Sequence, residues 1–358
     1  MPKAIVAGLG IQGVAIAYAM RKLGFDVMGI ESFGRAKQFS DELLKELGCE
    51  IESIEGDAID LFRVRVRPYA PDIVISALPF NHNLDLAEKC IGYGFRYCDL
   101  GGNIFASDAI DTLAELKGSA PVMTDLGLAP GIVNVIAEIG CEELGDVDSV
   151  KIRVGGLPVN PEGRLKYGLL FSIQGLYNEY IEKCRAIKDG KESAMDPLTD
   201  IESIHFDGVG DLEAFNTSGG LSTTLYSMLD RGVSECNYKT MRFPGHAEIV
   251  RSMLFEEKMN LDEFTRAITN ECKFIREDQA LMIVEIRARD GRVWEKRMRV
   301  VHDENLTAMQ KTTGFGAAAV AAIMGRGKMD EVKSAGFSDV PHMEFVENMS
   351  LLLPEMVI

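Results

Sequence analysis

The sequence predicts an α/β fold in which an N-terminal, doubly wound parallel sheet precedes an α+β domain with a mixed, largely antiparallel sheet. Three observations predict it. Short apolar runs alternate with helical patterns over the first 130 residues, a glycine-rich turn directly follows the first run, and later runs alternate polar with apolar residues. With 358 residues, 46% of them hydrophobic, the chain is long enough for two packed units.

The opening apolar run (KAIVA) leads directly into Gly8-x-Gly10-x-x-Gly13, a helical pattern follows, and the next run (DVMGIE) ends at Glu31. This order of strand, glycine turn, helix, strand and acid is the dinucleotide fingerprint of a Rossmann domain. The first glycine permits the tight turn, the second lets the backbone approach a pyrophosphate, and the third lets helix and strand pack closely. The alternative is an α/β fold whose first turn is tight for structural reasons alone.

Glu31 stands where a carboxylate accepts hydrogen bonds from the adenosine ribose, and its charge would repel a 2′-phosphate. This favours NAD, while the nearby Arg35 keeps NADP as the alternative. The residues expected to bind the cofactor are Gly8, Gly10, Ile11, Gln12, Gly13, Glu31, Ser32, Asp57, Ala77, Leu78 and Pro79.

Later apolar runs continue the parallel sheet, with expected strands at residues 50–56, 72–78, 97–100 and 122–126. The last two are followed by polar clusters that contain Asp99 and Asp125. Because the carboxyl ends of parallel strands share one edge of the sheet, these side chains are expected to face a common crevice.

After a helix near residues 132–143 the pattern changes to alternating strands, expected at 150–154, 165–173, 278–288 and 293–301. The last two flank Asp-Gly, a strong hairpin signal. Residues 307–327 form a helix rich in alanine, which either returns to cover the first domain or is an ordinary buried helix. We therefore expect a Rossmann domain at 1–130, a substrate and oligomerisation domain at 131–306, and a C-terminal helical segment at 307–358 that returns to the Rossmann domain.

A formal net charge of −17 argues against a nucleic-acid or anionic-membrane partner. The first residues form a strand rather than a signal peptide, and no apolar stretch is long enough to span a bilayer, so a cytoplasmic location is expected. The seven cysteines are scattered and expected to be reduced, and the five histidines lack metal-binding spacing, so no metal site is expected.

Motifs along most of the chain resemble the saccharopine dehydrogenase family, and within it the compact lysine 6-dehydrogenase branch. They are GLGIQG (8–13), ISALP (75–79), DLGG (99–102), DLGLAPG (125–131), VGGLP (154–158), SIQGLYNEY (172–180), LEAFNTSGG (212–220), KTMRFPGH (239–246) and TAMQKTTGF (307–315). The short chain and the LAPG sequence favour that branch. The resemblance implies a Rossmann domain made of both chain ends, a mixed-sheet substrate domain, and a homodimer or homotetramer.

The implied activity is the NAD-dependent oxidative deamination of the ε-amine of L-lysine to the 6-semialdehyde, with release of ammonia. Such a site needs a cationic anchor for the amino-acid carboxylate, a group that removes a proton from the ε-ammonium, and stabilisation of the forming iminium. Arg242 is the expected anchor, because a guanidinium binds a carboxylate bidentately. Its alternative is a surface arginine paired with an acid.

The remaining candidates each have a structural alternative. His246 either transfers a proton or holds its loop, and Asp99 and Asp125 either attract the ε-ammonium or cap turns. Tyr167, expected on a strand, either lines the pocket or fills it. Asn216, Thr217 and Ser218 either contact the α-amino and carboxylate groups or serve the turn.

Two other functions remain open. A saccharopine dehydrogenase would need a second cationic anchor, for which Arg153, Arg164 and Lys166 are available. A non-catalytic NAD-binding sensor would bind the dinucleotide without turnover and would be indifferent to the loss of Arg242.

Overall fold

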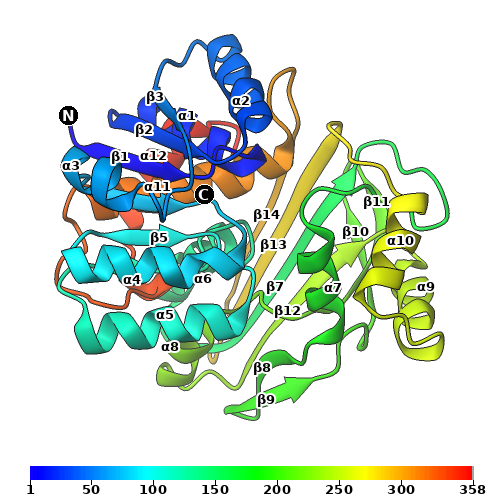
Figure 1. Ribbon diagram of the computed structural model, residues 1–358. Coiled ribbons are helices and arrows are strands. Elements are labelled where there is room, and N and C mark those ends of the chain that lie inside the picture. Colours follow the sequence, from blue (N-terminus) through cyan, green and yellow to red (C-terminus); the bar gives the residue numbers. More distant parts are fainter. Residues whose placement is uncertain (357–358) are drawn as a thin grey trace. The chain divides into compact units, whose positions relative to one another are not determined.

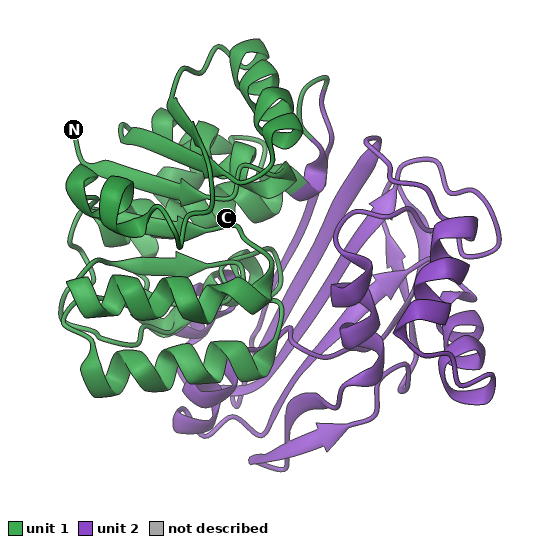
Figure 2. Ribbon diagram, in the orientation of Figure 1, with its two compact units in different colours: residues 1–135, 304–306, 310–358 green, residues 136–303, 307–309 purple. Residues whose placement is uncertain are grey.

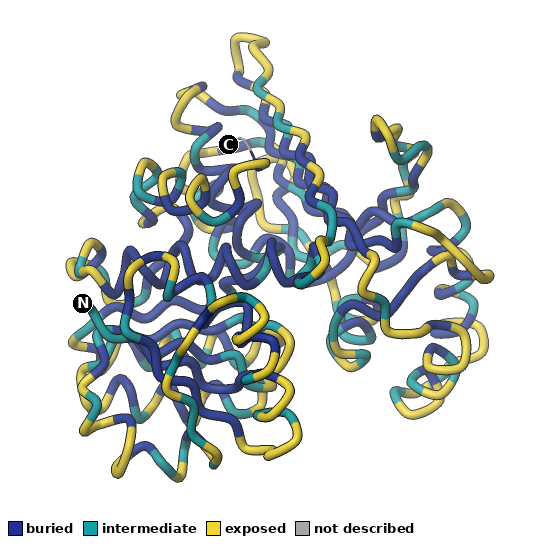
Figure 3. Tube along the Cα trace, turned by 90° about the horizontal axis from the view of Figure 1, so that it is seen from above, coloured by how far each residue is buried: buried dark blue, intermediate teal, exposed yellow. Residues whose placement is uncertain are grey.

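The computed structural model describes residues 1–356 and divides the chain into two compact units. Unit 1 contains residues 1–135, 304–306 and 310–358, and unit 2 contains residues 136–303 and 307–309 (Figure 2). Both ends of the chain therefore belong to unit 1. Figure 3 shows that buried segments run through the interior, whereas exposed segments lie mainly at the periphery.

Unit 1 is built around a six-stranded sheet in the order β3-β2-β1-β4-β5-β6, and every pair is parallel. The order reverses between β1 and β4, which is where doubly wound sheets bind ligands beyond the carboxyl ends of their strands. This confirms the predicted doubly wound sheet, with strands shorter than expected. The strands are β1 (Lys3–Ala7), β2 (Asp26–Glu31), β3 (Glu52–Glu55), β4 (Ile73–Ser76), β5 (Tyr97–Asp99) and β6 (Val122–Met123).

The helices that flank this sheet include α11, in which every residue is buried. Small residues explain how it packs: a Cβ added at Gly314 would lie 2.6 Å from the Ala15 Cβ, and one at Gly325 would lie 2.7 Å from the Phe25 ring. The helices are α1 (Ile11–Lys22), α2 (Gly34–Glu46), α3 (Arg67–Tyr69), α4 (Asn83–Tyr93), α5 (Ile104–Lys117), α11 (Phe315–Gly325) and α12 (His342–Leu352) (Figure 1). Helix α6 (Ile132–Leu144) begins in unit 1 and continues in unit 2.

Unit 2 contains an eight-stranded mixed sheet with the path β10-β11-β12-β7-β13-β14, to which the β8–β9 hairpin is attached through β12. Strands β7 and β12 pair in parallel, and the other described pairs are antiparallel. The predicted hairpin between β13 and β14 is confirmed. The strands are β7 (Val147–Pro158), β8 (Cys184–Lys188), β9 (Lys191–Met195), β10 (Glu202–Phe206), β11 (Gly210–Asn216), β12 (Glu235–Arg242), β13 (Asp278–Ala288) and β14 (Val293–Val301).

The sheet of unit 2 curves until its two edges meet. Arg297 on β14 donates to the carbonyl of His205 on β10, and Arg299 donates to the carbonyl of Gly208 beyond it. The curved face encloses an apolar cluster of Leu157, Phe206, Leu212, Ala214, Met241, Leu281 and Ile283. The helices of this unit are α7 (Ile173–Ile181), α8 (Thr224–Asp230), α9 (His246–Arg251) and α10 (Leu261–Glu271).

The strand predicted at residues 165–173 is wrong. This segment is irregular apart from a single bridge between Leu169 and Phe274, and helix α7 begins at its end, capped by Ser172. The alternation of apolar residues reflects burial in a core cluster, while Lys166 adopts a φ of +49° that no strand permits. Tyr167 therefore lies on a loop rather than on a strand.

Candidate functional site

The glycine turn after β1 has the geometry that the fingerprint requires. Gly8 has a φ of +85°, and a Cβ there would lie 2.9 Å from the carbonyl oxygen of Ala77. A Cβ at Gly13 would lie 1.8 Å from the carbonyl oxygen of Gly8. Both positions are therefore restricted to glycine by the protein itself, because a side chain would collide with backbone.

Gly10 differs from the other two glycines of the turn. Its φ of −65° suits any residue, and a Cβ would meet nothing within 4 Å. Beside it, Oε1 of Gln12 is buried without a hydrogen-bond partner among the described residues. Open space at this glycine fits a ligand that lies against the N-terminus of α1, where backbone N–H groups favour phosphate. The unsatisfied oxygen of Gln12 would accept a hydrogen bond from a donor of such a ligand.

Glu31, at the end of β2, is buried and braces the turn. Its Oε2 accepts a hydrogen bond from the N–H of Leu9 at 2.9 Å, and its Oε1 accepts one from the N–H of Phe33 at 3.1 Å. Each carboxylate oxygen keeps one lone pair for a further donor, such as a ribose hydroxyl. Arg35 is exposed and has no ion pair or hydrogen bond with another described residue.

The other residues expected at the cofactor lie along the same edge of the sheet in unit 1. Ala77, Leu78 and Pro79 follow β4, and the N–H of Ala77 donates to the carbonyl of Ala7. Ser32 is exposed directly after β2. Asp57 follows β3 and accepts hydrogen bonds from the N–H groups of residues 59 and 60, so its carboxylate also holds its own turn.

Asp99 and Asp125 lie together beyond β5 and β6. Oδ1 of Asp99 accepts hydrogen bonds from the N–H of Gly101 at 2.8 Å and from the N–H of Asp125 at 3.3 Å, and Oδ2 accepts one from Tyr97 at 3.0 Å. Burial, followed by the charge of Asp125, raises the pKa of Asp99 to about 7. Asp99 is fully buried, whereas Asp125 is only partly buried and accepts a hydrogen bond from Ser107.

A third carboxyl group that the sequence reasoning missed completes this cluster. Thr124 donates to Asp111, and burial together with the charges of Asp125 and Asp99 raises the pKa of Asp111 to about 7. Asp111 lies inside α5, between β5 and β6 in the sequence. It does not follow a strand, so the pattern that predicted Asp99 and Asp125 could not predict it. Among residues 1–356, no group of His, Cys, Asp and Glu is arranged to hold a metal ion.

In unit 2, Arg242 ends β12 and is only 4% exposed. Its guanidinium carbon lies 4.8 Å from the centre of the Tyr167 ring, Nε donates to the Tyr180 hydroxyl at 3.3 Å, and Nη1 donates to the carbonyl of Met241 at 3.0 Å. Within the described part of the chain no carboxylate forms an ion pair with it. Arg242 is thus a buried cation whose partners are neutral, not a surface arginine paired with an acid.

The Tyr180 hydroxyl also lies 3.1 Å from Nε2 of His246, and Nδ1 of His246 lies 3.1 Å from the carbonyl oxygen of Leu165. Burial and the charge of Arg242 lower the pKa of His246 to about 3. The neutral ring therefore donates from Nδ1 to Leu165 and accepts from Tyr180, which in turn accepts from Arg242. The predicted residues Arg242, Tyr167 and His246 are brought together by Tyr180, which the sequence reasoning had not singled out.

Glu179 precedes Tyr180 on α7 and was also missed. Burial raises the pKa of its carboxyl group to about 7, opposed by the charge of Arg242. Its side chain forms neither an ion pair nor a hydrogen bond with another residue of the described range. The only signal in the sequence was its place in the SIQGLYNEY motif (172–180), which identifies no role.

Asn216, Thr217 and Ser218 are buried, and each side chain is hydrogen bonded within the protein. The amide of Asn216 donates to Thr199, the hydroxyl of Thr217 lies 2.7 Å from that of Thr240, and Ser218 donates to Glu182. These bonds reach other segments of unit 2, and the substrate role of the three residues stays a prediction.

The three cations considered for a second anchor differ in their surroundings. Arg153 is buried and forms an ion pair with Glu202, and Arg164 is exposed and forms one with Glu271 at 2.6 Å. Lys166 is exposed and has no ion pair or hydrogen bond with another described residue.

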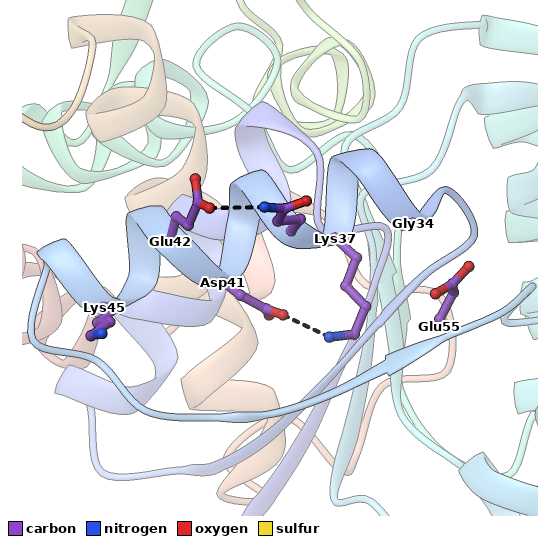
Figure 4. A pocket seen from close by; sticks show the side chains of 7 residues that line it. Gly34, Lys37, Asp41, Glu42, Lys45 and Glu55 are labelled. Carbon is purple, nitrogen blue, oxygen red and sulfur yellow. Dashed lines mark hydrogen bonds and ion pairs between the residues drawn. The ribbon is translucent and has the colours of Figure 1, made fainter.

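A shallow groove of about 390 Å³ lies along α2 in unit 1. On its wall Lys37 forms an ion pair with Asp41 at 2.6 Å, and the amide of Gln38 donates a hydrogen bond to Glu42 at 3.1 Å (Figure 4). It contains none of the residues expected at the cofactor or the substrate, and we assign it no role.

The fold and these side chains define a two-unit protein with a dinucleotide-binding type of turn in unit 1 and a buried guanidinium that forms no ion pair within the described residues in unit 2. The saccharopine dehydrogenase C-terminal domain family matches residues 127–349, more than half of the chain. The chain therefore belongs to the saccharopine dehydrogenase family.

Solved structures agree with this fold. A saccharopine dehydrogenase (L-Glu forming) from Saccharomyces cerevisiae matches with a TM-score of 0.72 and 15% identity, over 98% of this chain and 97% of that chain. An amine dehydrogenase from Mycobacterium smegmatis matches with a TM-score of 0.46 and 12% identity, over 95% and 96%. At these identities the first match concerns the fold alone, and the second is too distant to bear on function. No helix within residues 1–356 is long and apolar enough to cross a membrane.

Proposed function

We propose that the protein is an NAD-dependent amino acid dehydrogenase that oxidises the ε-amine of L-lysine to the 6-semialdehyde and releases ammonia. The observation that carries this proposal is the buried guanidinium of Arg242, which has hydrogen bonds to neutral groups and no acidic partner. A buried, unpaired cation is costly, so the arrangement favours a ligand that brings a carboxylate.

The turn around Gly10 would hold the dinucleotide pyrophosphate, and the free lone pairs of Glu31 would accept the ribose hydroxyls. When bound, the oxidised nicotinamide supplies a hydride acceptor. Arg242 would hold the α-carboxylate, with its plane fixed by Tyr167 and its Nε fixed by Tyr180.

Proton removal is assigned to the Asp99–Asp125 pair. Burial, followed by the charge of Asp125, raises the pKa of Asp99 to about 7, close to the pH at which a general base is most useful. Asp125, the partly exposed member, would accept the ammonium proton and release it to solvent, and its carboxylate, negative again, would stabilise the iminium. Water adds to the iminium and ammonia leaves, so each turnover gives one semialdehyde, one ammonium ion, one reduced nicotinamide and one proton.

His246 is assigned a positioning role. Its lowered pKa makes it a poor proton acceptor at neutral pH, and both ring nitrogens already have partners.

Saccharopine dehydrogenase activity is the second candidate, because the family is named for it. That substrate carries an additional dicarboxylic arm. Arg153 and Arg164 are neutralised by Glu202 and Glu271, which leaves Lys166 as the cation for such an arm. The pairing of these arginines supports the smaller substrate.

The test follows the absorbance of reduced nicotinamide with NAD or NADP and a panel of lysine, ornithine and saccharopine. Reduction with lysine, together with one equivalent of ammonia, is the expected result. Reduction with saccharopine alone, with glutamate as product, would instead establish the second candidate. Dinucleotide binding without turnover of any amine would favour a sensor. Arg242→Ala should abolish turnover, while Arg164→Ala, which removes an exposed and paired arginine, is the matched control and should have no effect.

A further inference from the structure

We infer that Glu179 binds the α-ammonium of the substrate while Arg242 binds its α-carboxylate, so that unit 2 selects α-amino acids by both charges of the zwitterion. This inference rests on the proposed function, in which Arg242 is the carboxylate anchor. It adds the substrate class that the same site accepts.

The first argument is that Arg242 and Glu179 are both shielded from solvent and that neither forms an ion pair within the described residues. Arg242 is nearly fully buried and Glu179 is partly buried, yet no ion pair joins them, and neither has an oppositely charged partner elsewhere in the described chain. They are nevertheless linked through Tyr180, which follows Glu179 on α7 and whose hydroxyl accepts a hydrogen bond from Nε of Arg242 at 3.3 Å. In agreement with this link, the charge of each group changes the pKa of the other. Two opposite charges that are near each other but not in contact suit a ligand that carries both complementary charges.

The second argument is that both groups are fixed by adjacent residues. Glu179 and Tyr180 are consecutive on α7, and the Tyr180 hydroxyl accepts the hydrogen bond from Arg242. The carbonyl of Glu179 accepts a hydrogen bond from the N–H of Ser218 at 3.1 Å, which ties the helix to the loop after β11. The helix therefore carries Glu179 and, through the Tyr180 hydroxyl, orients the guanidinium of Arg242 on β12.

The third argument is that the neighbouring acids are already occupied. Glu213 accepts hydrogen bonds from the N–H groups of Gly245 and Ala247 at the start of α9, and Glu182 accepts one from Ser218. Glu179 has no such bond. Its raised pKa adds support, because an ammonium ion would stabilise the charged carboxylate that burial disfavours.

In a zwitterion the ammonium and the carboxylate stand on the same carbon atom. A ligand with both groups would leave no unpaired charge at this place, whereas a ligand with one of them would leave either Arg242 or Glu179 without a partner. Because an unpaired buried charge is costly, compounds that lack one charge should bind much more weakly.

The test uses the full-length protein and ligands that need not react. L-norleucine has both α-charges and no ε-amine, hexanoate has only the carboxylate, and hexylamine has only the ammonium. By titration calorimetry, L-norleucine should bind at least about tenfold more tightly than either compound, the loss expected for one unpaired charge. Equal binding of hexanoate and L-norleucine to the wild-type protein would overturn the inference without any variant.

A pair of variants tests the residue itself. Glu179→Gln should weaken L-norleucine binding roughly tenfold and leave hexanoate binding unchanged, because the lost contact is charge-assisted. Glu248→Gln, which removes an exposed acid of α9, is the matched control and should bind like the wild type. Unchanged L-norleucine binding by a folded Glu179→Gln protein would refute the role of Glu179.

The outcomes separate this inference from the proposed function. Binding of L-norleucine without turnover of lysine would retain the recognition pair and reject the lysine reaction. Turnover of lysine with no preference for L-norleucine over hexanoate would retain the reaction and reject the pair.

Discussion

The hydroxyl of Tyr180 lies 3.1 Å from Nε2 of His246, and both side chains are almost completely buried. Since the histidine is neutral and donates from its other nitrogen, the tyrosine must donate to it and is left as an acceptor for Arg242. The direction of the bond from Tyr180 to His246 thus fixes the direction of the bond from Arg242 to Tyr180. The hydrogen bonds that hold the guanidinium of Arg242 are made to neutral groups.

Tyr180→Phe should raise the KM for the amino acid roughly 10- to 150-fold and change kcat little. The reason is that Arg242 loses the bond that orients Nε, a loss of order 1.5–3 kcal/mol for a bond to a charged group. Steady-state kinetics measure the split. The control is Tyr177→Phe on the same helix, whose ring packs against Phe264 and whose hydroxyl has no hydrogen bond within residues 1–356. Equal KM values for the two variants would contradict the positioning role.

Gly10→Ala should weaken NAD binding at least about tenfold, or roughly 1.4 kcal/mol, without loss of stability. The added methyl group meets no protein atom within 4 Å, so it would occupy only the space proposed for the pyrophosphate. Calorimetric titration and thermal unfolding measure the two effects. Gly92→Ala, at another open and exposed helical glycine, should bind NAD normally and gain roughly 0.5–1 kcal/mol of stability. Normal NAD binding by Gly10→Ala would place the cofactor elsewhere.

Glu31→Gln should reduce the preference for NAD over NADP by roughly tenfold, because the charge that repels a 2′-phosphate is lost. The amide has one acceptor oxygen in place of two, so either Leu9 or Phe33 loses its hydrogen bond and a lower melting temperature is also expected. The ratio of the two dissociation constants is the informative quantity. Arg35→Ala should change this ratio in the opposite direction if the exposed guanidinium contributes to NADP binding.

Unit 1 was predictable from the sequence because its signals are local. The glycine turn, the run ending in Glu31 and Asp99 at the end of β5 lie where the pattern placed them, while Asp125 follows the shorter β6 by two residues. Parallel strands buried on both faces give continuous apolar runs, which short windows detect.

Unit 2 was less predictable because its signals depend on tertiary contacts. The run at 165–173 alternates like a strand but lies in a core cluster. Strands β8 to β12 were missed because polar and apolar residues are mixed in these short runs, so that tertiary contacts decide which of them are buried. Glu179 and Tyr180 gain their significance only when α7 places them beside Arg242. No spacing in the sequence encodes that contact.

Asp99→Asn should make the protein relatively more stable as the pH rises. The folded-state pKa of Asp99 is raised to about 7 from the ordinary value of 3.8, so the folded protein holds a proton that the unfolded chain releases between these values. The wild type therefore loses stability as the pH increases through this window, by up to about 1.4 kcal/mol per pH unit from this group. Urea unfolding at pH 4.5 and pH 7.5 should show the difference in free energy between Asp99→Asn and wild type shifting in favour of the variant at the higher pH. A difference independent of pH would show that Asp99 is ionised throughout.

His246→Gln should reveal the opposite dependence. Burial lowers the pKa of His246 from 6.5 to about 3, so below pH 6.5 the unfolded chain takes up a proton that the folded protein refuses. The wild type consequently loses stability as the pH falls from 6.5 towards 3, again by up to about 1.4 kcal/mol per unit. Above pH 6.5 this group contributes no pH dependence, and His246→Gln should be less stable than wild type there because the bonds to Tyr180 and Leu165 are disturbed. That deficit should shrink as the pH is lowered, since the variant has no histidine to protonate at this position.

Asp99 and His246 lie in different units, so unfolding must be followed by a probe in each, such as Trp294 for unit 2. A deficit that stays constant from pH 7.5 to pH 4.5 would mean that His246 is protonated in the folded protein, and its assignment as a neutral acceptor for Tyr180 would then be incorrect.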